Sequence, residues 1–596
     1  DNRLNKESLR ILTGVRGDLG QHARYDLSLN IGRVDRNETI LNNRMYDRYL
    51  AAIDAVIDPT TGQVVCRSNL DPGSFNSLPI DFISTAFQTS RGPATFTPGP
   101  NSGCIPFNPF TLDDTANHAA TAWIWIPTSN RVKNHQRVVT GYVAGDSGAF
   151  FNFHGGPIEM VIGGEYRKES SSYTFDALSG SDRVVAFNNG RNLNGEFDVR
   201  EGFIEVSLPL FRDLNSAVRS LKLDAAARYS DYSTVGATST WKLGALWETV
   251  AGLSLRGTWS SAVRAPNIGE LYEARSNISI ALGQRDPCAL ANLDLGTEYR
   301  RSNCATALNA LGIDPNTFNP MLGTFFPAIS GGNPNLGEET ARTRTYGVLW
   351  QVPFINNLAL TVDWYDIRMS DAVLRTNQNT IFNACYDSPS LDNIFCRLIG
   401  RDPTNGYANF AELSYVNVAE IRSTGLELSA FYTFETANAG SFRGMLNATH
   451  MRRLGVQKSL LPVITDEKGL FNTDLGGSTP EWVASFDLSW NKGAWDANYG
   501  YSYSSKTLRA PPLINAQRDI AHEIIDAPYV KPYRNHDVQV GYRLNDRTRL
   551  HAGVRNISDQ YPDKTRGSLN GPSGRQGYAG RTFYIGFRMN FGDIWN

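Results

Sequence analysis

No stretch of this sequence is apolar over the roughly 18 to 20 residues that a membrane-spanning helix needs, so a helical membrane protein is excluded. An excess of one charge is also missing, since 57 Lys and Arg residues stand against 59 Asp and Glu residues. The bulk charge therefore points neither to nucleic acid nor to an anionic membrane surface as a partner, and we expect no nucleic acid. The first residues, Asp1 to Glu7, are polar and carry no signal-peptide pattern, so we expect a mature or truncated chain.

Glycine and aromatic residues, by contrast, are abundant. The 596 residues include 53 Gly, 29 Phe and 25 Tyr, and 41% of all residues are apolar. This composition favours many short strands and turns over layers of helices. A soluble chain of this length would form about four domains, but a barrel is an exception, and we interpret residues 1–596 as one barrel region.

The six cysteines form three pairs that are close in sequence, and each pair lies in one long polar connection. The pairs are Cys66 with Cys104, Cys288 with Cys304, and Cys385 with Cys396. An even count of locally paired cysteines is typical of disulfides made in an oxidising compartment such as the periplasm or the cell surface. Free thiols or a metal site are the alternatives, but no CxxC spacing or neighbouring histidine supports a metal. We therefore predict three disulfides and an exported protein.

Apolar and polar residues alternate over long segments, as in a membrane β-strand that faces lipid with one side and a polar lumen with the other. In the segment 582–591, the apolar face carries Phe583, Ile585, Phe587, Met589 and Phe591. Arg588 lies on the other face, and we expect it to point inward because an arginine facing mid-bilayer lipid would cost several kcal/mol. The same alternation recurs in segments 221–229, 358–364, 482–490 and 495–503.

The connections predict which side of the membrane each strand end faces. Predicted strands of about ten residues exceed the usual five or six of soluble sheets, which argues against a propeller or a sandwich. Short connections alternate strictly with long ones, such as 35–131, 266–340 and 371–419. Short periplasmic turns and long extracellular loops are typical of the outer membrane, so we predict an all-β, antiparallel transmembrane β-barrel.

The number of strands indicates that this barrel is incomplete. We count about 17 strands by periodicity, which is odd, whereas single-chain bacterial barrels generally have an even number. The C-terminus is then periplasmic and Asp1 extracellular. If the full barrel has about 22 strands, the size of the plugged class, we expect about five further strands and a plug domain outside this chain.

Four segments resemble the motifs of TonB-dependent outer-membrane receptors. Segment 259–272, with Arg264, Ala265 and Pro266 in succession, resembles a strand-to-loop signature of that family. Segment 331–340, with Asn333, Pro334 and Glu338, resembles the element that re-enters the next strand, and segments 553–562 and 580–591, with Asn556 and Phe591, resemble the last two strands. Segments 58–66 and 104–110 look like the large-loop subclass that is common in sphingomonads.

The resemblance implies a transporter in the outer membrane of a Gram-negative bacterium. Such a receptor takes up a scarce, bulky extracellular ligand through a plugged barrel, and the TonB–ExbB–ExbD complex pulls on an N-terminal TonB box. We find neither plug nor TonB box in this sequence. The implied partners are outer-membrane lipid and lipopolysaccharide, the TonB complex, an extracellular ligand and, in some receptors, a surface lipoprotein.

Motifs of enzyme chemistry are weak. The segment Gly145-Asp-Ser-Gly148 resembles a serine-protease nucleophile sequence, but it lies in a predicted periplasmic connection and we interpret it as a turn. The eight histidines have no metal-ligand spacing, and Glu338 with Glu339 is more readily a solvated pair than a general acid and base. We expect no enzyme activity and no cofactor.

Candidate ligand contacts lie in the long loops. Aromatic side chains there could stack on a ligand or pack the loops together, and we favour packing: Trp123, Trp125, Phe325, Phe326, Tyr386 and Phe395. Arg264, Arg275 and Arg285 could attract an anionic chelate, although solvated loop charge is the simpler interpretation. A passive porin-like barrel, and a surface barrel that acts as a docking partner or adhesin, remain alternatives to TonB-coupled import.

Overall fold

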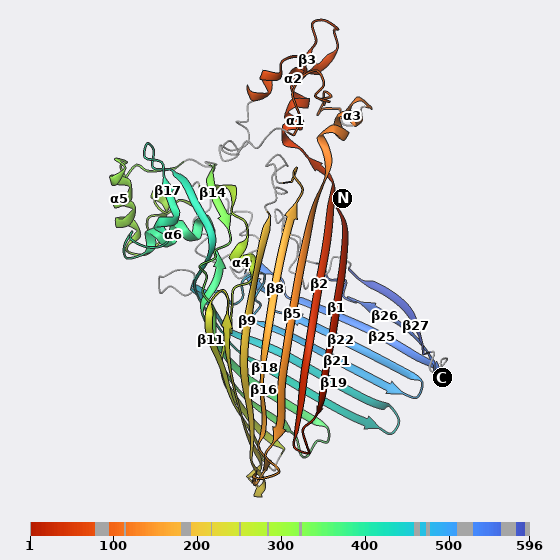
Figure 1. Cartoon of the computed structure of the whole chain (residues 1–596). Helices are drawn as coiled ribbons and strands as arrows, with labels where there is room; N and C mark the ends of the chain where they lie inside the picture. Colours follow the sequence, from red (N-terminus) through yellow and green to blue (C-terminus); the bar gives the residue numbers. More distant parts are fainter. Residues whose placement is uncertain are drawn as a thin grey trace.

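The computed structural model describes most of the chain. It covers residues 2–77, 95–111, 115–179, 192–215, 217–249, 252–282, 285–320, 325–457, 465–471, 477–508, 529–561 and 580–590. The fold is a single curved β-sheet, called the wall below, with elaborated loops at one end (Figure 1).

The wall is built from strands that each pair antiparallel with the next one along the chain. The main sheet has 21 strands among the described residues, and four short ones, β13, β14, β17 and β20, belong to loops, which leaves 17 in the wall. These are β1 (Asn2–Asp18), β2 (Ala23–Arg44), β5 (Trp125–Asp146), β8 (Glu159–Phe175), β9 (Leu193–Asn215), β10 (Val218–Tyr232), β11 (Gly236–Glu248), β12 (Leu253–Arg264), β15 (Glu339–Gln351), β16 (Leu358–Arg375), β18 (Ala408–Thr436), β19 (Gly440–Gln457), β21 (Trp482–Lys492), β22 (Trp495–Ser504), β25 (Tyr533–Asn545), β26 (Thr548–Arg555) and β27 (Thr582–Met589). The predicted all-β, antiparallel architecture and its 17 strands are confirmed.

The strands are longer than the sequence periodicity predicted. β2 and β5 have 22 residues each and β18 has 29, not about ten. The β2–β5 ladder continues from Ala23 opposite Gly145 up to Arg44 opposite Trp125. Periodicity detects a strand only where one face is apolar, and these strands continue upward with polar residues on both faces. The connections 35–131 and 371–419 are correspondingly shorter than predicted.

The strict alternation of short and long connections is also wrong at one place. β10 and β11 are joined by residues 233–235 alone, at the end of the wall where the long loops lie. Gly236 closes this turn with a φ of +76°, a backbone conformation that glycine adopts without steric cost. A tight hairpin therefore replaces the long loop that the pattern predicted at this point.

The two faces of the wall differ as the alternation predicted. One face carries the large exposed apolar side chains, including Val348, Val362 and Phe587. Residues directly opposite in an antiparallel pair share a face, so the register Val348 opposite Val362 extends this apolar face from strand to strand. We call it the outer face. The opposite, luminal face carries Arg256, Asp363 and Arg588, so the predicted inward direction of Arg588 is confirmed.

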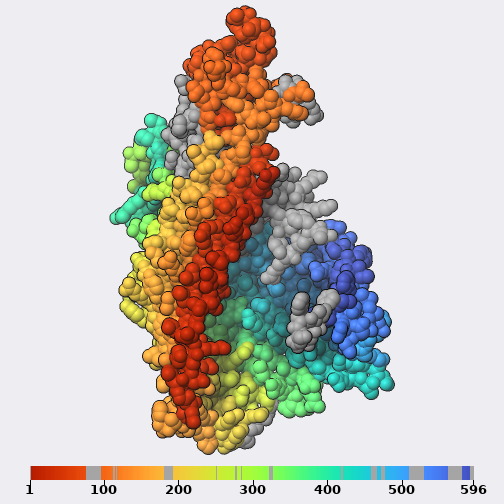
Figure 2. All heavy atoms as spheres, turned by 45° about the vertical axis from the view of Figure 1, so that its right-hand side comes forward, coloured from red at the N-terminus to blue at the C-terminus, as the bar shows by residue number. Residues whose placement is uncertain are grey.

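The sheet curves around a hollow but stays open along one side. Within the described residues β1 pairs only with β2, and β27 pairs only with β26. The space-filling view looks through this opening, between the red β1 and the blue C-terminal strands, onto the concave luminal face (Figure 2).

Two loop lobes stand at the end of the wall where the long connections lie. Lobe A, residues 45–125, contains α1 (Tyr46–Ile53), β3 (Ala55–Ile57), β4 (Val64–Cys66), α2 (Arg67–Leu70) and α3 (Thr115–Ile124). Lobe B combines parts of the loops 265–338 and 376–407 with the start of β18 and contains β13 (Ser276–Ala281), α5 (Arg300–Ala310), β14 (Phe325–Gly331), α6 (Gln378–Asp387) and β17 (Ile399–Arg401). Figure 1 shows α5, α6, β14 and β17 gathered beside the top of the wall. In the described part of the chain, every helix is too short or too polar to cross a membrane.

An arginine on the outer face should destabilise the protein far more than an arginine on the luminal face. Val362→Arg places a charge halfway along the apolar face, where lipid contact costs about 2–4 kcal/mol. Thr361→Arg, one residue earlier, points into the lumen and should cost under about 1 kcal/mol. The free energy of unfolding of the full-length protein in lipid vesicles, from guanidinium titration, checks this. Equal losses for the two variants would contradict the assignment of the faces.

Candidate functional site: luminal wall and loop lobes

A polar pocket of about 430 Å³ lies on the luminal face between β9 and β12. The Glu201 carboxylate at its base is nearly buried, accepts a hydrogen bond from Ser230 Oγ at 2.6 Å and pairs with Arg228 at 3.1 Å. Lys242 also lines the pocket and has no ion pair among the described residues. Glu205, an exposed acid, also lines the pocket and has no ion pair among the described residues, so the pocket offers unpaired groups of both charges to a polar ligand.

A second luminal feature fastens the wall across three strands. Arg256 on β12 reaches over β15 and binds Asp363 on β16 in bidentate fashion, at 2.7 and 2.5 Å. The contact passes above Gly347, where a Cβ atom would lie only 1.9 Å from Asp363 Oδ1. Glycine is thus required at position 347 for this crossing, and a bidentate pair of this kind fixes its partners geometrically.

The first two motif segments meet where β12 leaves the wall and β15 re-enters it. Arg264 contacts the carboxylates of both Glu270 and Glu339. Ala265 and Pro266 lead into α4 (Ile268–Tyr272), which begins with a capping box formed by Asn267 and Glu270. This arrangement uses Arg264 to join the two strand ends, which leaves it little freedom to bind an anionic ligand.

Asn333 closes the same junction from the other side. Its backbone N–H donates to Glu270 O at 2.8 Å, and its side-chain amide donates to Tyr415 O at 2.9 Å. Pro334 is exposed in the following turn, and Glu338 is half-buried just before β15. The residues that resemble family motifs thus hold together the junction between the end of β12 and the start of β15.

Asn556 ends β26 in a similar structural role. Its φ is +52°, its backbone N–H donates to Asp537 Oδ1 at 2.8 Å, and its side-chain oxygen accepts from Gln560 N–H at 2.9 Å. Asparagine tolerates this left-handed conformation better than most residues. Phe591, the other motif position near the C-terminus, lies outside the described residues.

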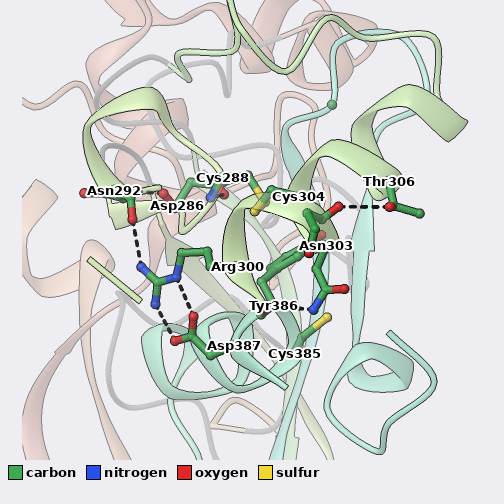
Figure 3. Close-up of a disulfide and its surroundings, with 12 residues drawn as sticks. Asp286, Cys288, Asn292, Arg300, Asn303, Cys304, Thr306, Cys385, Tyr386 and Asp387 are labelled. Carbon is green, nitrogen blue, oxygen red and sulfur yellow. Dashed lines mark hydrogen bonds and ion pairs between the residues drawn. A yellow bond between two sulfur atoms is a disulfide. The ribbon is translucent and has the colours of Figure 1, made fainter. Parts of the chain in front are cut away.

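Lobe B has its own hydrophobic core, closed by two disulfides. Cys288–Cys304 and Cys385–Cys396 form as predicted, and Phe326, Phe382 and Phe395 are buried around them. Next to the first disulfide, Arg300 binds Asp387 at 2.5 Å and donates to Asn292 O at 3.0 Å (Figure 3). This contact joins α5 to α6, so the two loops form one unit.

A buried ion pair lies at the centre of lobe B. The Arg401 guanidinium binds both oxygens of Asp286 at 2.7 Å and donates to Tyr386 Oη at 2.6 Å. Burial disfavours the charged form of Arg401, but the attraction of Asp286 prevails and raises the pKa of the arginine. Burial also disfavours the charged form of Tyr386 and therefore raises the pKa of its hydroxyl, although the nearby Arg401 guanidinium acts to lower it. Both groups therefore keep one protonation state at neutral pH and serve to hold the lobe.

Lobe A repeats this organisation on a smaller scale. Cys66–Cys104, the third predicted disulfide, lies in a core with Ile124 and Phe107. Trp123 packs against Phe96 and under the Arg48 guanidinium, at 5.5 Å from the ring centre. Long loops with their own cores keep a fixed shape, which lowers the entropic cost of binding a ligand.

The structure places most predicted ligand contacts inside the lobes. Phe326, Tyr386 and Phe395 are 0–3% exposed in the core of lobe B, and Trp125 packs against Phe107 in lobe A. Only the backbone of Phe325 is described, as part of β14. Arg275 pairs with Glu412 at 2.8 Å, and Arg285 is exposed. The polar pocket of the luminal wall was not predicted, because it depends on the register that brings residues of neighbouring strands side by side.

The protease-like segment forms a turn. Ser147 Oγ donates to Phe151 O at 2.6 Å and accepts from Ile158 N–H at 2.8 Å, so the backbone occupies this hydroxyl. His22 Nδ1 lies 2.8 Å from Asp146 Oδ1, next to the serine and not bonded to it. In the described ranges no group of three His, Cys, Asp or Glu side chains is placed to hold a metal ion.

Comparison with known families identifies the fold. Residues 8–557 match the family model described as TonB dependent receptor-like, beta-barrel. The chain belongs to this family. The resemblance drawn from the four motif segments is thereby confirmed at the level of the family.

One solved structure supports this family fold, and a second is similar at a lower level. The siderophore receptor PirA from Acinetobacter baumannii superposes with a TM-score of 0.53 at 13% identity, over 99% of this chain and 63% of PirA. The ferric-catecholate import receptor Fiu from K12 E. coli gives a TM-score of 0.48 at 13% identity, over 99% of this chain and 64% of Fiu. This chain thus spans less than two thirds of the length of either receptor.

Removing the acid of the buried pair should open lobe B locally. Asp286→Asn leaves the Arg401 guanidinium buried without a counter-ion, which costs about 3–5 kcal/mol. Asp392→Asn removes the acid of the exposed pair Arg397–Asp392 in the same lobe and should cost under about 1 kcal/mol. Hydrogen exchange of α5 and α6 in the full-length protein measures the difference. Protection should fall at least about 100-fold for Asp286→Asn only, and equal protection in both variants would rule out this role of the pair.

Proposed function

We propose that the full-length protein is an outer-membrane transporter that binds a scarce extracellular ligand and imports it with energy from TonB. The family match over residues 8–557 carries this proposal. The apolar outer face and polar luminal face support a position in a bilayer. The disulfides of both lobes support exposure to an oxidising compartment.

The division of the molecule into loop lobes and a wall fits a transporter that first captures a ligand and then passes it along the lumen. The two lobes stand at the loop end of the wall and carry rigid cores, so they suit a vestibule that selects a ligand. The luminal face below them carries free and paired charges, among them Lys242, Arg228 and Glu201. A polar ligand that leaves the vestibule would exchange water for these groups as it moves inward.

We further propose that additional strands and a plug domain complete the barrel. The opening between β1 and β27 leaves two strand edges without partners among the described residues. Unpaired backbone groups are costly at membrane depth, so membrane barrels are closed. About five more strands would bring the wall to about 22, the size of barrels with a plugged lumen.

The partners follow from this function. The TonB–ExbB–ExbD complex would act on a TonB box in the plug, lipid and lipopolysaccharide would surround the wall, and a surface lipoprotein could cover the lobes. The ligand class stays open between a siderophore, cobalamin, an oligosaccharide, a peptide and an aromatic compound. Import of a ligand rather than catalysis is the chemistry that this site supports.

Uptake assays test the proposal. We expect deletion of the full-length gene to abolish high-affinity uptake of one member of a labelled panel: ferric siderophores, cobalamin, maltodextrins, oligopeptides and aromatic compounds. Deletion of the tonB gene should abolish the same uptake, because the ligand passes a closed lumen only with applied energy. Induction by iron starvation or by a carbon source selects the panel member to begin with.

Two other results would contradict the proposal. Uptake that persists without TonB would indicate a passive porin-like barrel. Unchanged uptake of every compound, together with loss of a co-purifying surface protein on deletion, would indicate a docking barrel or adhesin.

A further inference from the structure

The outer face of the wall carries an unusual group of basic side chains, which we call the arginine patch: Arg342, Arg344, Arg368 and Arg422. Arg342 and Arg344 are exposed and alternate along β15 in phase with Tyr346 and Val348. The patch is therefore on the outside of the wall and separate from the lumen. It lies toward the loop end, above the apolar part of the outer face.

Three of these arginines stand side by side across neighbouring strands. Arg342 is directly opposite Arg368, and Arg368 is directly opposite Arg422. Directly opposed residues of an antiparallel pair project to the same face with their Cβ atoms about 4.5–5.5 Å apart, and like charges there are destabilising. Negative charge close to this row of arginines would relieve their mutual repulsion.

The chain supplies only part of that charge. Asp366 is buried and binds Arg422 through both oxygens at 3.0 Å, with Arg368 at 3.6 Å. Among the described residues, Arg342 has no hydrogen bond or ion pair, and the Arg344 guanidinium lies 5.5 Å from the centre of the Trp259 ring. Arg342, Arg344 and Arg368 line a pocket of about 510 Å³ on the outer face. Two further carboxylates, those of Asp371 and Glu420, line the loop side of this pocket.

A row of aromatic residues runs just below the patch. Tyr346 is directly opposite Trp364, and their rings stack at 5.7 Å. Farther along the same face, His450 stacks on Trp482 at 4.3 Å. Trp and Tyr concentrate at the level of the lipid headgroups in membrane proteins. The arginines, one and two residue pairs above this row, therefore lie at or just outside the headgroup level.

We propose that the arginine patch binds the phosphate groups of a phosphorylated glycolipid in the outer leaflet. A guanidinium matches phosphate oxygens in bidentate fashion. Arg342 and Arg344 have no ion pair among the described residues, although Arg344 is directly opposite Asp366. The aromatic row beneath would contact the sugars and the start of the acyl chains. Asp371 and Glu420 repel an anion above the row, so the phosphates would bind between Arg342, Arg344 and Arg368. This inference relies on the membrane orientation in the proposed function, and not on transport.

The test uses the full-length protein purified in a neutral detergent. Native mass spectrometry with a titrated bis-phosphorylated glucosamine disaccharide lipid measures binding to the wild type and to the triple variant R342Q/R344Q/R368Q. We expect at least a tenfold weaker affinity for the triple variant. The variant R342K/R344K/R368K should lie between the two, because lysine keeps the charge but loses the bidentate geometry.

A matched variant removes the same charge from the luminal face. K242Q/R443Q/R588Q neutralises three inward-facing residues that have no ion pair among the described residues, and its affinity for the lipid should equal that of the wild type. Equal weakening in both triple variants would overturn the proposal, because it would reflect bulk charge only. Unchanged binding in R342Q/R344Q/R368Q would overturn it as well.

Two further measurements complete the test. One distinguishes a lipid phosphate from free inorganic phosphate, and the other distinguishes failure of the arginine-patch proposal from failure of the transport proposal. Inorganic phosphate at 10 mM should displace little lipid; complete displacement would indicate a site for a free anion and contradict a lipid site. The uptake assay is run on the wild type and on R342Q/R344Q/R368Q, and not on the luminal variant, whose residues lie along the proposed ligand path. Normal lipid binding with no TonB-dependent uptake would reject the transport proposal alone, whereas uptake with no loss of lipid binding in the triple variant would reject the patch alone.

Discussion

The whole molecule depends on one constraint, the alternation of side-chain direction along strands that are paired in antiparallel register. Because directly opposed residues share a face, one apolar residue on a strand commits its neighbours across the sheet to the same side. The series Val348 opposite Val362, and Val362 opposite Leu428, carries the apolar face from β15 to β18. The same register places the charged residues between these apolar positions on the luminal face.

This constraint also explains why the hydrophobic cores lie in the loops. A single sheet with one apolar and one polar face has no interior of its own, so the fully buried side chains of the described chain lie mainly in lobes A and B. Each lobe is too small for its hydrophobic core alone to stabilise it. Disulfides supply additional stability in small extracellular units of this kind. The buried Arg401–Asp286 pair adds geometric specificity to lobe B at the cost of desolvation.

The sequence predicted the wall well and the lobes poorly, for physical reasons. Alternation identified the strands and the inward direction of Arg588, and the local cysteine pairs identified the disulfides. The upper strands escaped prediction because both of their faces are polar, as in the β2–β5 extension. Tyr386 and Phe395 are aromatic loop residues that could contact a ligand or pack the loops, and only the hydrophobic cluster formed by both loops of lobe B shows that they are core. The contacts of Arg256 with Asp363 depend on the order of three strands, which local pattern does not contain.

The measurement that tests the central claim most directly is the accessibility of spin labels along one wall strand. Single cysteines at each position from Ala359 to Tyr365 on β16, in the full-length protein in lipid vesicles, would carry the label, since the native cysteines of the described chain are in disulfides. Collision with oxygen, which concentrates in lipid, should be high at Leu360, Val362 and Trp364. Collision with a water-soluble nickel chelate should be high at the positions between them. A profile without a period of two, or with the opposite phase, would contradict the two-faced membrane wall.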